Sequence, residues 1–189
     1  MTQETPVVYA AGFAALRAQG WDIPGAVIDG KRGVAKVFEP LPVQVCHFHQ
    51  VKTVTKYLTR KPKTYAGQEL RSLALRLTKS NEKEFALLLF DWQRRWQEFL
   101  AERTPCSGCK PNRWPYTHRK LRAAFRSLVT NLPHLFTYQK DPALGLPNTT
   151  NCLDGMFSQI KNRLAVHRGL RRDRRYKLIE EILRGKERN

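Results

Sequence analysis

Apolar side chains recur along the chain with two different periods, which predict helices in some segments and strands in others. Near the amino end, Tyr9, Phe13 and Leu16 follow one another at helical spacing,. Thr5 before Pro6 is a capping residue followed by a proline at the first helical position,. We therefore predict that one helix precedes every other element.

Two short apolar segments after this helix predict strands. The first, residues 23–28, ends in a turn at Asp29-Gly30, and the second covers residues 43–46,. Residues 34–38 between them fit a short crossover helix. A strand–helix–strand unit of this kind has parallel strands that are covered on both faces.

The middle of the chain has a helical pattern and no strand signals. Its clearest segment, residues 82–100, carries one apolar stripe, and Asn81 and Glu84 are placed as a capping box at its start,. Trp92 and Trp96 fall on this stripe, so we predict that both pack in the core and do not stack on bases. The same period predicts two further helices, at residues 68–79 and 117–132.

The last part of the chain predicts two more helices. One opens near Asn151, and the other covers residues 173–183,. The first has an apolar face that is made of Leu153, Met156, Phe157, Ile160 and Leu164.

Net charge makes nucleic acid the default partner. The 189-residue chain has a formal net charge of +18, a positive excess that requires a polyanion to neutralise it,. From Lys161 onward the sequence has eleven basic and four acidic residues, so the excess is clustered. Within this cluster we predict DNA contacts from Lys161, Arg163, Arg168, Arg171, Arg172, Arg174 and Arg175.

The sequence predicts a soluble cytoplasmic protein. No apolar segment approaches the roughly 20 residues that a membrane-spanning helix needs, and the amino end does not resemble an export signal. The four cysteines are therefore expected to stay reduced,. Ribosomal and chromatin-like proteins are also basic, so nucleic-acid binding without chemistry remains an alternative.

Two carboxylates could carry chemistry. Asp29 follows a buried strand, so its side chain is expected at the carboxyl edge of a parallel sheet, where sites in open α/β folds lie. Asp154 lies in the first turn of a predicted helix, where the helix dipole favours negative charge. Each has a simpler explanation, since Asp-Gly is common in turns and the spacing of Asn151 and Asp154 fits a cap.

The cysteines suggest two weak metal half-sites. Cys46 and His49 are three positions apart after the second strand, but zinc requires four ligands,. Cys106-Ser-Gly-Cys109 is a better zinc half-site, for which His118 and Cys152 are the only conceivable completions,. A tight turn that the glycine assists is the alternative for this second pair.

Several of these features occur in one order that resembles a known family. Its marks are an Asp-Gly strand end, a Cys-x-x-His after the next strand, and a helix with a Thr-x-Asn-x-x-acid motif. The chain resembles the transposases of bacterial insertion sequences that are related to Mutator-like elements, from about Val7 to Leu183. The matching segments are Val27-Ile28-Asp29-Gly30, Val45-Cys46-His47-Phe48-His49 and Thr149-Thr150-Asn151-Cys152-Leu153-Asp154.

The resemblance implies an α/β, helix-rich fold with a ribonuclease H-like core that an all-helical insertion interrupts. The expected organisation is a partial core with two parallel strands (residues 1–52), the insertion (53–146), and a final core helix with a basic helix (147–189). Asp29 matches the second of three metal-binding carboxylates. Asp154 matches the third, where the family more often has Glu.

The first carboxylate of the family lies on an earlier strand, for which about twenty-eight residues before Asp29 leave no room. Asp22 cannot replace it, because it would lie at the opposite end of the strand. We therefore expect the carboxyl-terminal part of a transposase, from a truncated or frameshifted gene or a start codon assigned too late, which is inactive alone.

The resemblance implies a DNA transposase that cleaves and joins strands with Mg²⁺ or Mn²⁺ and acts on element ends and target DNA. It also implies association with the nucleoid and a possible homo-oligomer. Two alternatives stay open. One is a non-catalytic basic DNA-binding protein derived from a transposase, and the other is a zinc-stabilised helical module around Cys106 and Cys109.

Overall fold

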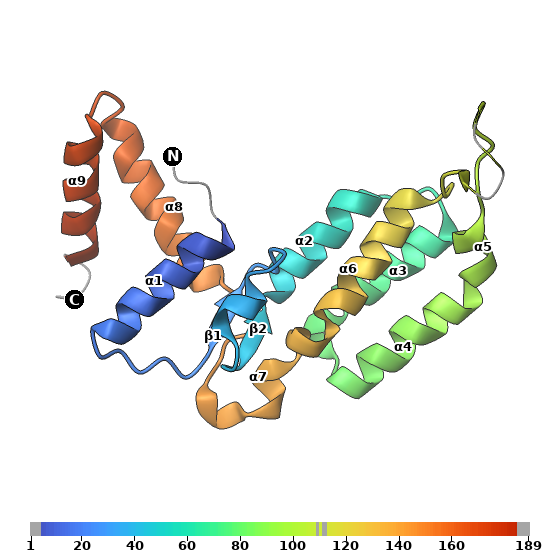
Figure 1. Cartoon of the computed structure of the whole chain (residues 1–189), viewed down its shortest axis with the longest axis horizontal. Helices are drawn as coiled ribbons and strands as arrows, with labels where there is room; N and C mark the ends of the chain where they lie inside the picture. Colours follow the sequence, from blue (N-terminus) through green and yellow to red (C-terminus); the bar gives the residue numbers. More distant parts are fainter. Residues whose placement is uncertain (1–4, 109, 111–112, 185–189) are drawn as a thin grey trace. The chain divides into compact units, whose positions relative to one another are not determined.

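The computed structural model describes residues 5–108, 110 and 113–184. The chain divides into two compact units, Met1–Thr149 (unit 1) and Thr150–Asn189 (unit 2), each of which is described by itself below. Most of the described residues are helical, and the strands form one small parallel sheet in unit 1 (Figure 1).

The first helix, α1 (Pro6–Ala18), begins where the sequence predicts it. The hydroxyl of Thr5 accepts the backbone N–H of Val8, which caps the helix, and Pro6 occupies its first turn,. Phe13 packs edge to face against Phe38, with ring centroids 5.3 Å apart,.

The sheet pairs β1 (Ala26–Ile28) with β2 (Val43–Val45) in parallel, so that Val27 lies opposite Gln44. The connection between the strands contains the short 3-10 helix η1 (Ala35–Phe38). Every residue of β2 is buried, as expected for a parallel strand that is covered on both faces,. The predicted strand–helix–strand unit is therefore confirmed.

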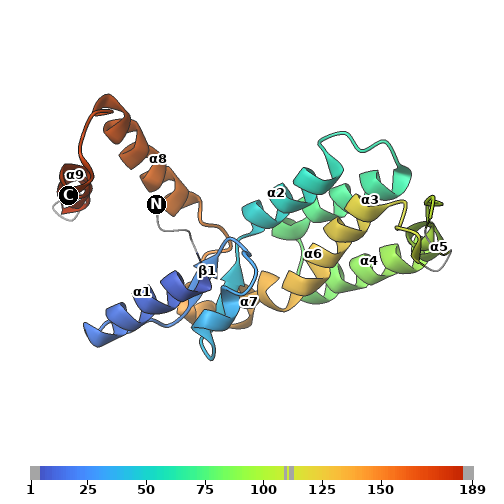
Figure 2. The same cartoon turned by 45° about the horizontal axis from the view of Figure 1, so that its top comes forward.

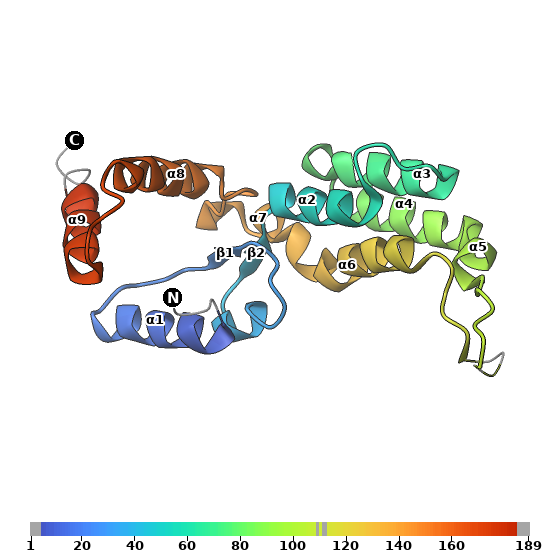
Figure 3. The ribbon, with the colours of Figure 1, turned by 90° about the horizontal axis from the view of Figure 1, so that it is seen from above.

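Most of unit 1 is a bundle of helices that follows the sheet. Figures 1 and 2 show α2 and α6 side by side, and Figure 3 shows the bundle from above. The main core of unit 1 contains Leu70, Leu89, Trp92, Leu128 and Phe136 at 0–1% exposure. Its helices are α2 (His47–Leu58), α3 (Tyr65–Leu75), η2 (Leu77–Lys79), α4 (Glu82–Arg95), α5 (Gln97–Ala101), α6 (Arg119–Leu135), α7 (Thr137–Lys140) and η4 (Pro142–Leu144).

Three of the predicted helices differ from the structure, and the one predicted at residues 68–79 is α3 followed by the 3-10 helix η2. The segment 82–100 is not one helix, because the chain turns at Trp96, whose indole N–H donates to Glu69 Oε2 at 3.0 Å. The helix α6 does not end before Pro133 but includes it. Proline removes one helical hydrogen bond, and Leu135, two positions later in the same helix, is fully buried.

Unit 2 is a pair of helices, α8 (Asn151–Val166) and α9 (Arg172–Arg184). Its buried core consists of Ile160, Leu164 and Ile182, with Met156, Leu178 and Ile179 packed against them. The apolar face predicted for α8 is therefore only partly covered within this unit. Leu153 and Phe157 at its start are 46% and 47% exposed.

Among the residues that the structure describes, every helix is too short or too polar to cross a lipid bilayer.

Candidate functional site

Asp29 is the first residue after β1, at the carboxyl edge of the sheet. Its side chain is exposed, and Oδ1 accepts the backbone N–H of Lys31 at 2.9 Å. This bond forms a turn of the kind that Asp favours. The same arrangement leaves the carboxylate at the surface, so the turn and a ligand role are compatible.

The turn after Asp29 rests on buried amide side chains that the sequence did not indicate. Gly30 has φ +81°, and a Cβ at this position would lie 3.2 Å from Asn131 Nδ2 and from a methyl carbon of Val45. Asn131 Nδ2 donates to Gln50 Oε1 at 2.7 Å, and Gln50 Nε2 donates to the hydroxyl of Ser127 at 3.1 Å. Helices α2 and α6 therefore hold the turn that presents Asp29.

Cys46 and His49 have different environments. Cys46 is fully buried, and its backbone N–H donates to Ile28 O at 2.8 Å, which joins the ends of the two strands. His49 is half-buried, with its ring 5.6 Å from that of Phe48. Cys46 is thus a packing residue at the start of α2, and His49 is the member of the pair that solvent reaches.

His47, between them, is a buried polar residue that was not predicted. The carbonyl of Leu135 can only accept, so the ring donates from Nε2–H, and the buried Nδ1 has no partner among the described residues,. Burial lowers the pKa of His47 below its ordinary value of 6.5, and the bond to Leu135 opposes this shift,. The folded protein therefore favours the neutral ring.

This lowered pKa predicts a loss of stability in acid. The unfolded chain binds a proton at His47 at a higher pH than the folded chain does, so stability falls as pH drops through about 6.5. His47→Gln keeps a donor but cannot titrate, and it should flatten the pH dependence of the free energy of unfolding between pH 7.5 and 5.5. Urea unfolding measures this, with exposed His167→Gln as the control. An unchanged slope in His47→Gln would contradict the assignment.

The chain returns to this edge of the sheet after the helical bundle. The backbone N–H of His47 donates to Asn148 O at 2.9 Å, within unit 1. Asn148 comes shortly before α8 and six positions before Asp154. Asn148, about one hundred residues after His47, is thus fixed where β2 ends. The neighbouring strand β1 ends just before Asp29.

Asp154 lies in the first turn of α8 in unit 2, with an exposed side chain. Its Oδ2 accepts the hydroxyl of Thr150 at 2.9 Å. The prediction that Asn151 caps this helix is wrong, because Thr150 is at the cap position and no side chain caps the backbone there. The helix α8 begins at Asn151 itself, one residue earlier than a cap at Asn151 would place its start.

The two carboxylates suit a hard divalent cation by their chemistry. Both are exposed oxygen ligands, the type that Mg²⁺ and Mn²⁺ prefer,. Asp29 and Asp154 belong to different compact units. Within residues 5–108, 110 and 113–184, no three His, Cys, Asp or Glu side chains form a group that could hold a metal ion.

The structure describes three of the four residues that were named for a zinc site. Cys106 is exposed, and Cys109 lies outside the described residues. His118 Nε2 instead lies 2.8 Å from Glu102 Oε2, and its ring stacks on Phe99 with centroids 3.7 Å apart. Cys152 belongs to unit 2.

No protein-family model matches the chain, and no matching curated protein or solved structure was found.

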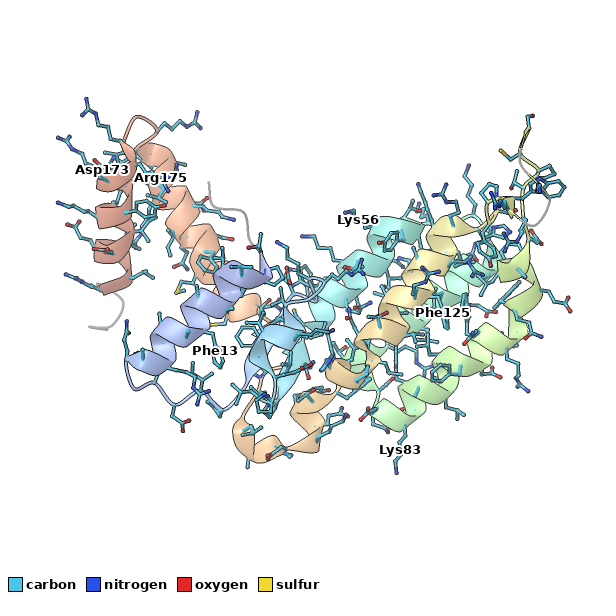
Figure 4. All side chains as sticks on the ribbon, viewed as in Figure 1. Phe13, Lys56, Lys83, Phe125, Asp173 and Arg175 are labelled. Carbon is cyan, nitrogen blue, oxygen red and sulfur yellow. The ribbon has the colours of Figure 1, made fainter. Side chains whose placement is uncertain are left out.

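The predicted DNA-contact residues share one property. All seven are exposed in unit 2, and the ion pairs between described residues all lie in unit 1. None of the seven is therefore neutralised by a described carboxylate. Figure 4 labels Arg175 on α9, together with Asp173 in the first turn of the same helix. The seven are Lys161, Arg163, Arg168, Arg171, Arg172, Arg174 and Arg175.

Proposed function

We propose that this chain is part of the catalytic domain of a DNA transposase with a ribonuclease H-like core. Asp29 and Asp154 are proposed as ligands of the same divalent cations, Mg²⁺ or Mn²⁺. Unit 2 is proposed to bind the DNA backbone through its basic side chains.

The observation that carries this proposal is the hydrogen bond between His47 N–H and Asn148 O. It fixes the segment that leads into α8 at the carboxyl edge of the parallel sheet. In open α/β folds this edge is where ligands bind. Asp29 lies at this edge already, and Asp154 follows Asn148 by six positions along the chain.

The two edges of the sheet give further support. The outer edge of β2 is occupied, because the hydroxyl of Thr137 donates to Val43 O at 2.7 Å. In β1, Ala26 N–H and Ile28 C=O face β2, so the N–H and C=O of Val27 point away from it,. The resemblance implies an earlier, central strand that carries the first carboxylate, and we propose that this strand pairs with the outer side of β1. Asp22 precedes β1 and lies at its amino end, away from Asp29.

The expected chemistry is attack on a phosphodiester. Bound divalent cations would polarise the phosphate and activate the attacking oxygen. The residues of this chain would hold the cations through the carboxylates of Asp29 and Asp154. The arginines of unit 2 would neutralise phosphates and set the position of the DNA without reading its sequence.

Removing either carboxylate should weaken cation binding. We expect Asp29→Asn and Asp154→Asn each to lower the affinity for Mn²⁺ by about tenfold or more, because each removes a charged oxygen ligand. Titration calorimetry measures the affinity. Asp22→Asn and Asp173→Asn are matched controls that should leave it unchanged.

The result also separates the alternatives. Unchanged Mn²⁺ affinity in both variants, with DNA binding intact, would favour the non-catalytic DNA-binding protein over the transposase. Stoichiometric zinc in the purified chain would favour a zinc-stabilised module. Magnesium-dependent DNA cleavage by this chain, abolished by Asp29→Ala, would overturn our expectation that the chain is inactive alone.

A further inference from the structure

The helix α2 has two faces of different character. His47, Gln50, Val54 and Leu58 are buried against the rest of unit 1. The exposed positions are Phe48, Lys52 and Lys56, each four residues from the next. A spacing of four places the three side chains on one face, about 6 Å apart along the helix axis.

The loop after α2 also carries exposed basic and aromatic side chains. Residues 40–68 contain no acidic side chain. Arg60, Lys61 and Lys63 are exposed in this loop, and Tyr65 at the start of α3 is 78% exposed. We call Phe48, Lys52, Lys56, Arg60, Lys61, Lys63 and Tyr65 the α2 stripe.

The loop of the α2 stripe is held in place. Gln68 Nε2 donates to Pro62 O at 3.1 Å, and a Cβ at Gly67 would lie 3.0 Å from the Pro62 ring. Thr59, where α2 ends, has φ +68° and ψ 176°, a region that β-branched residues avoid,. A strained residue in a packed loop is typical of a segment that presents side chains to a ligand.

The cations of the α2 stripe are available to a partner. The ion pairs of the described residues use other basic side chains, at positions 76, 94, 95, 118 and 140. Phe48 is 53% exposed and precedes these cations in the sequence, and the exposed Tyr65 follows them. Proteins bind single-stranded nucleic acid with basic side chains that contact the phosphates and aromatic rings that stack on the bases.

We propose that the α2 stripe binds a single-stranded segment of nucleic acid, with bases stacked on Phe48 and Tyr65 and phosphates on the cations between them. A duplex keeps its bases stacked on each other, so it would use the cations but not the rings. This surface lies on unit 1 and does not depend on the carboxylates or on the basic helix of unit 2. It therefore extends the proposed function without requiring it.

The test compares strands in the absence of divalent cations. Fluorescence anisotropy with labelled (dT)12 and with a 12-base-pair duplex is measured in EDTA, which separates this test from any failure of the metal site. Phe48→Ala with Tyr65→Ala should lower the affinity for (dT)12 by about tenfold or more and change that for the duplex by less than twofold. A (U)12 arm shows whether DNA or RNA binds more tightly.

A second pair of variants tests the cations. Lys52→Ala with Lys56→Ala should make the salt dependence of (dT)12 binding less steep. The magnitude of the negative slope of log affinity against log salt should fall by about 1.4. Lys79→Ala with Lys83→Ala is the matched control, because both lysines are exposed on another part of unit 1 and lose the same charge. Figure 4 shows Lys56 and Lys83 on opposite sides of the bundle in that view.

Two outcomes would overturn the proposal. The first is an aromatic double variant that binds (dT)12 as tightly as the parent chain or weakens the duplex equally. The second is a stripe that binds anionic phosphatidylserine vesicles but not (dT)12, since lysines and aromatic rings also suit a membrane surface. Circular dichroism checks that each variant folds. If the variant with Phe48→Ala does not fold, the variant with Lys52→Ala and Lys56→Ala still tests the proposal.

Discussion

Replacing Arg168, Arg171, Arg174 and Arg175 with alanine is expected to flatten the salt dependence of duplex DNA binding. Each arginine that neutralises one phosphate contributes about 0.9 to the slope of log affinity against log salt, so four contribute about 3.6. Between 50 and 200 mM salt, the parent chain should lose on the order of a hundredfold more affinity than the variant. Anisotropy titrations at several salt concentrations measure both slopes.

The matched control removes four cations that already have partners. Arg76, Arg94, Arg95 and Lys140 form ion pairs with carboxylates, with N···O distances from 2.7 to 3.7 Å. Changing these four to alanine removes the same charge but should alter the slope much less. Equal slopes in the two quadruple variants would mean that net charge alone drives DNA binding and that unit 2 has no special part in it.

The second large effect concerns stability. Trp92→Ala should lower the free energy of unfolding by about 3–5 kcal/mol, because it removes a large buried side chain and leaves a cavity. Trp92 is 1% exposed, stacks on Phe125 at 5.4 Å, and donates its indole N–H to Ala66 O at 3.1 Å. Urea denaturation measures the change.

Trp21→Ala is the control for this prediction, because Trp21 is 63% exposed and its loss should change stability by less than about 0.5 kcal/mol,. If Trp92→Ala does not fold, Trp92→Phe, which keeps most of the apolar surface, gives a smaller and measurable loss. A change below about 1 kcal/mol in Trp92→Ala would contradict the assignment of this residue to the core.

Periodicity predicted those parts of the fold in which packing follows one face of an element. The start of α1 and the Asn81 cap of α4 could be predicted because each depends on neighbouring residues, and the parallel strands because a short crossover joins two apolar segments. Trp92 was correctly assigned to the core, and Trp96 is half-buried. The turn at Trp96 has no signal in the local pattern, and its indole N–H bonds to Glu69, which is distant in the sequence.

The buried polar residues were missed for a related reason. Gln44, His47 and Gln50 are polar side chains at buried positions, and apolar patterns give them no signal. His47 and Gln50 do fall on the buried face of α2 with Val54, which is an indication of their burial in the sequence. Their partners on α6 and α7 become visible only when the fold brings these helices to the sheet.

The candidate site was predictable residue by residue but not as an assembly. Asp29 at the end of a strand and Asp154 in the first turn of a helix follow from local patterns. The Asn148 carbonyl that returns the chain to the edge of β2 is a long-range backbone contact, which has no sequence signature. Clustered charge points to the carboxyl end and gives no signal for the α2 stripe, although Phe48, Lys52 and Lys56 have a regular spacing.

The most direct test of the central claim is whether one Mn²⁺ ion contacts both carboxylates. In NMR spectra, substoichiometric Mn²⁺ should broaden the amide signals of Gly30 and Gly155, which follow Asp29 and Asp154, over the same range of concentration. Asp29→Asn should remove the broadening at Gly155, and Asp154→Asn should remove that at Gly30. If each variant loses broadening only beside its own substitution, or Gly155 is never broadened, the two carboxylates do not share a cation and the proposed site is wrong.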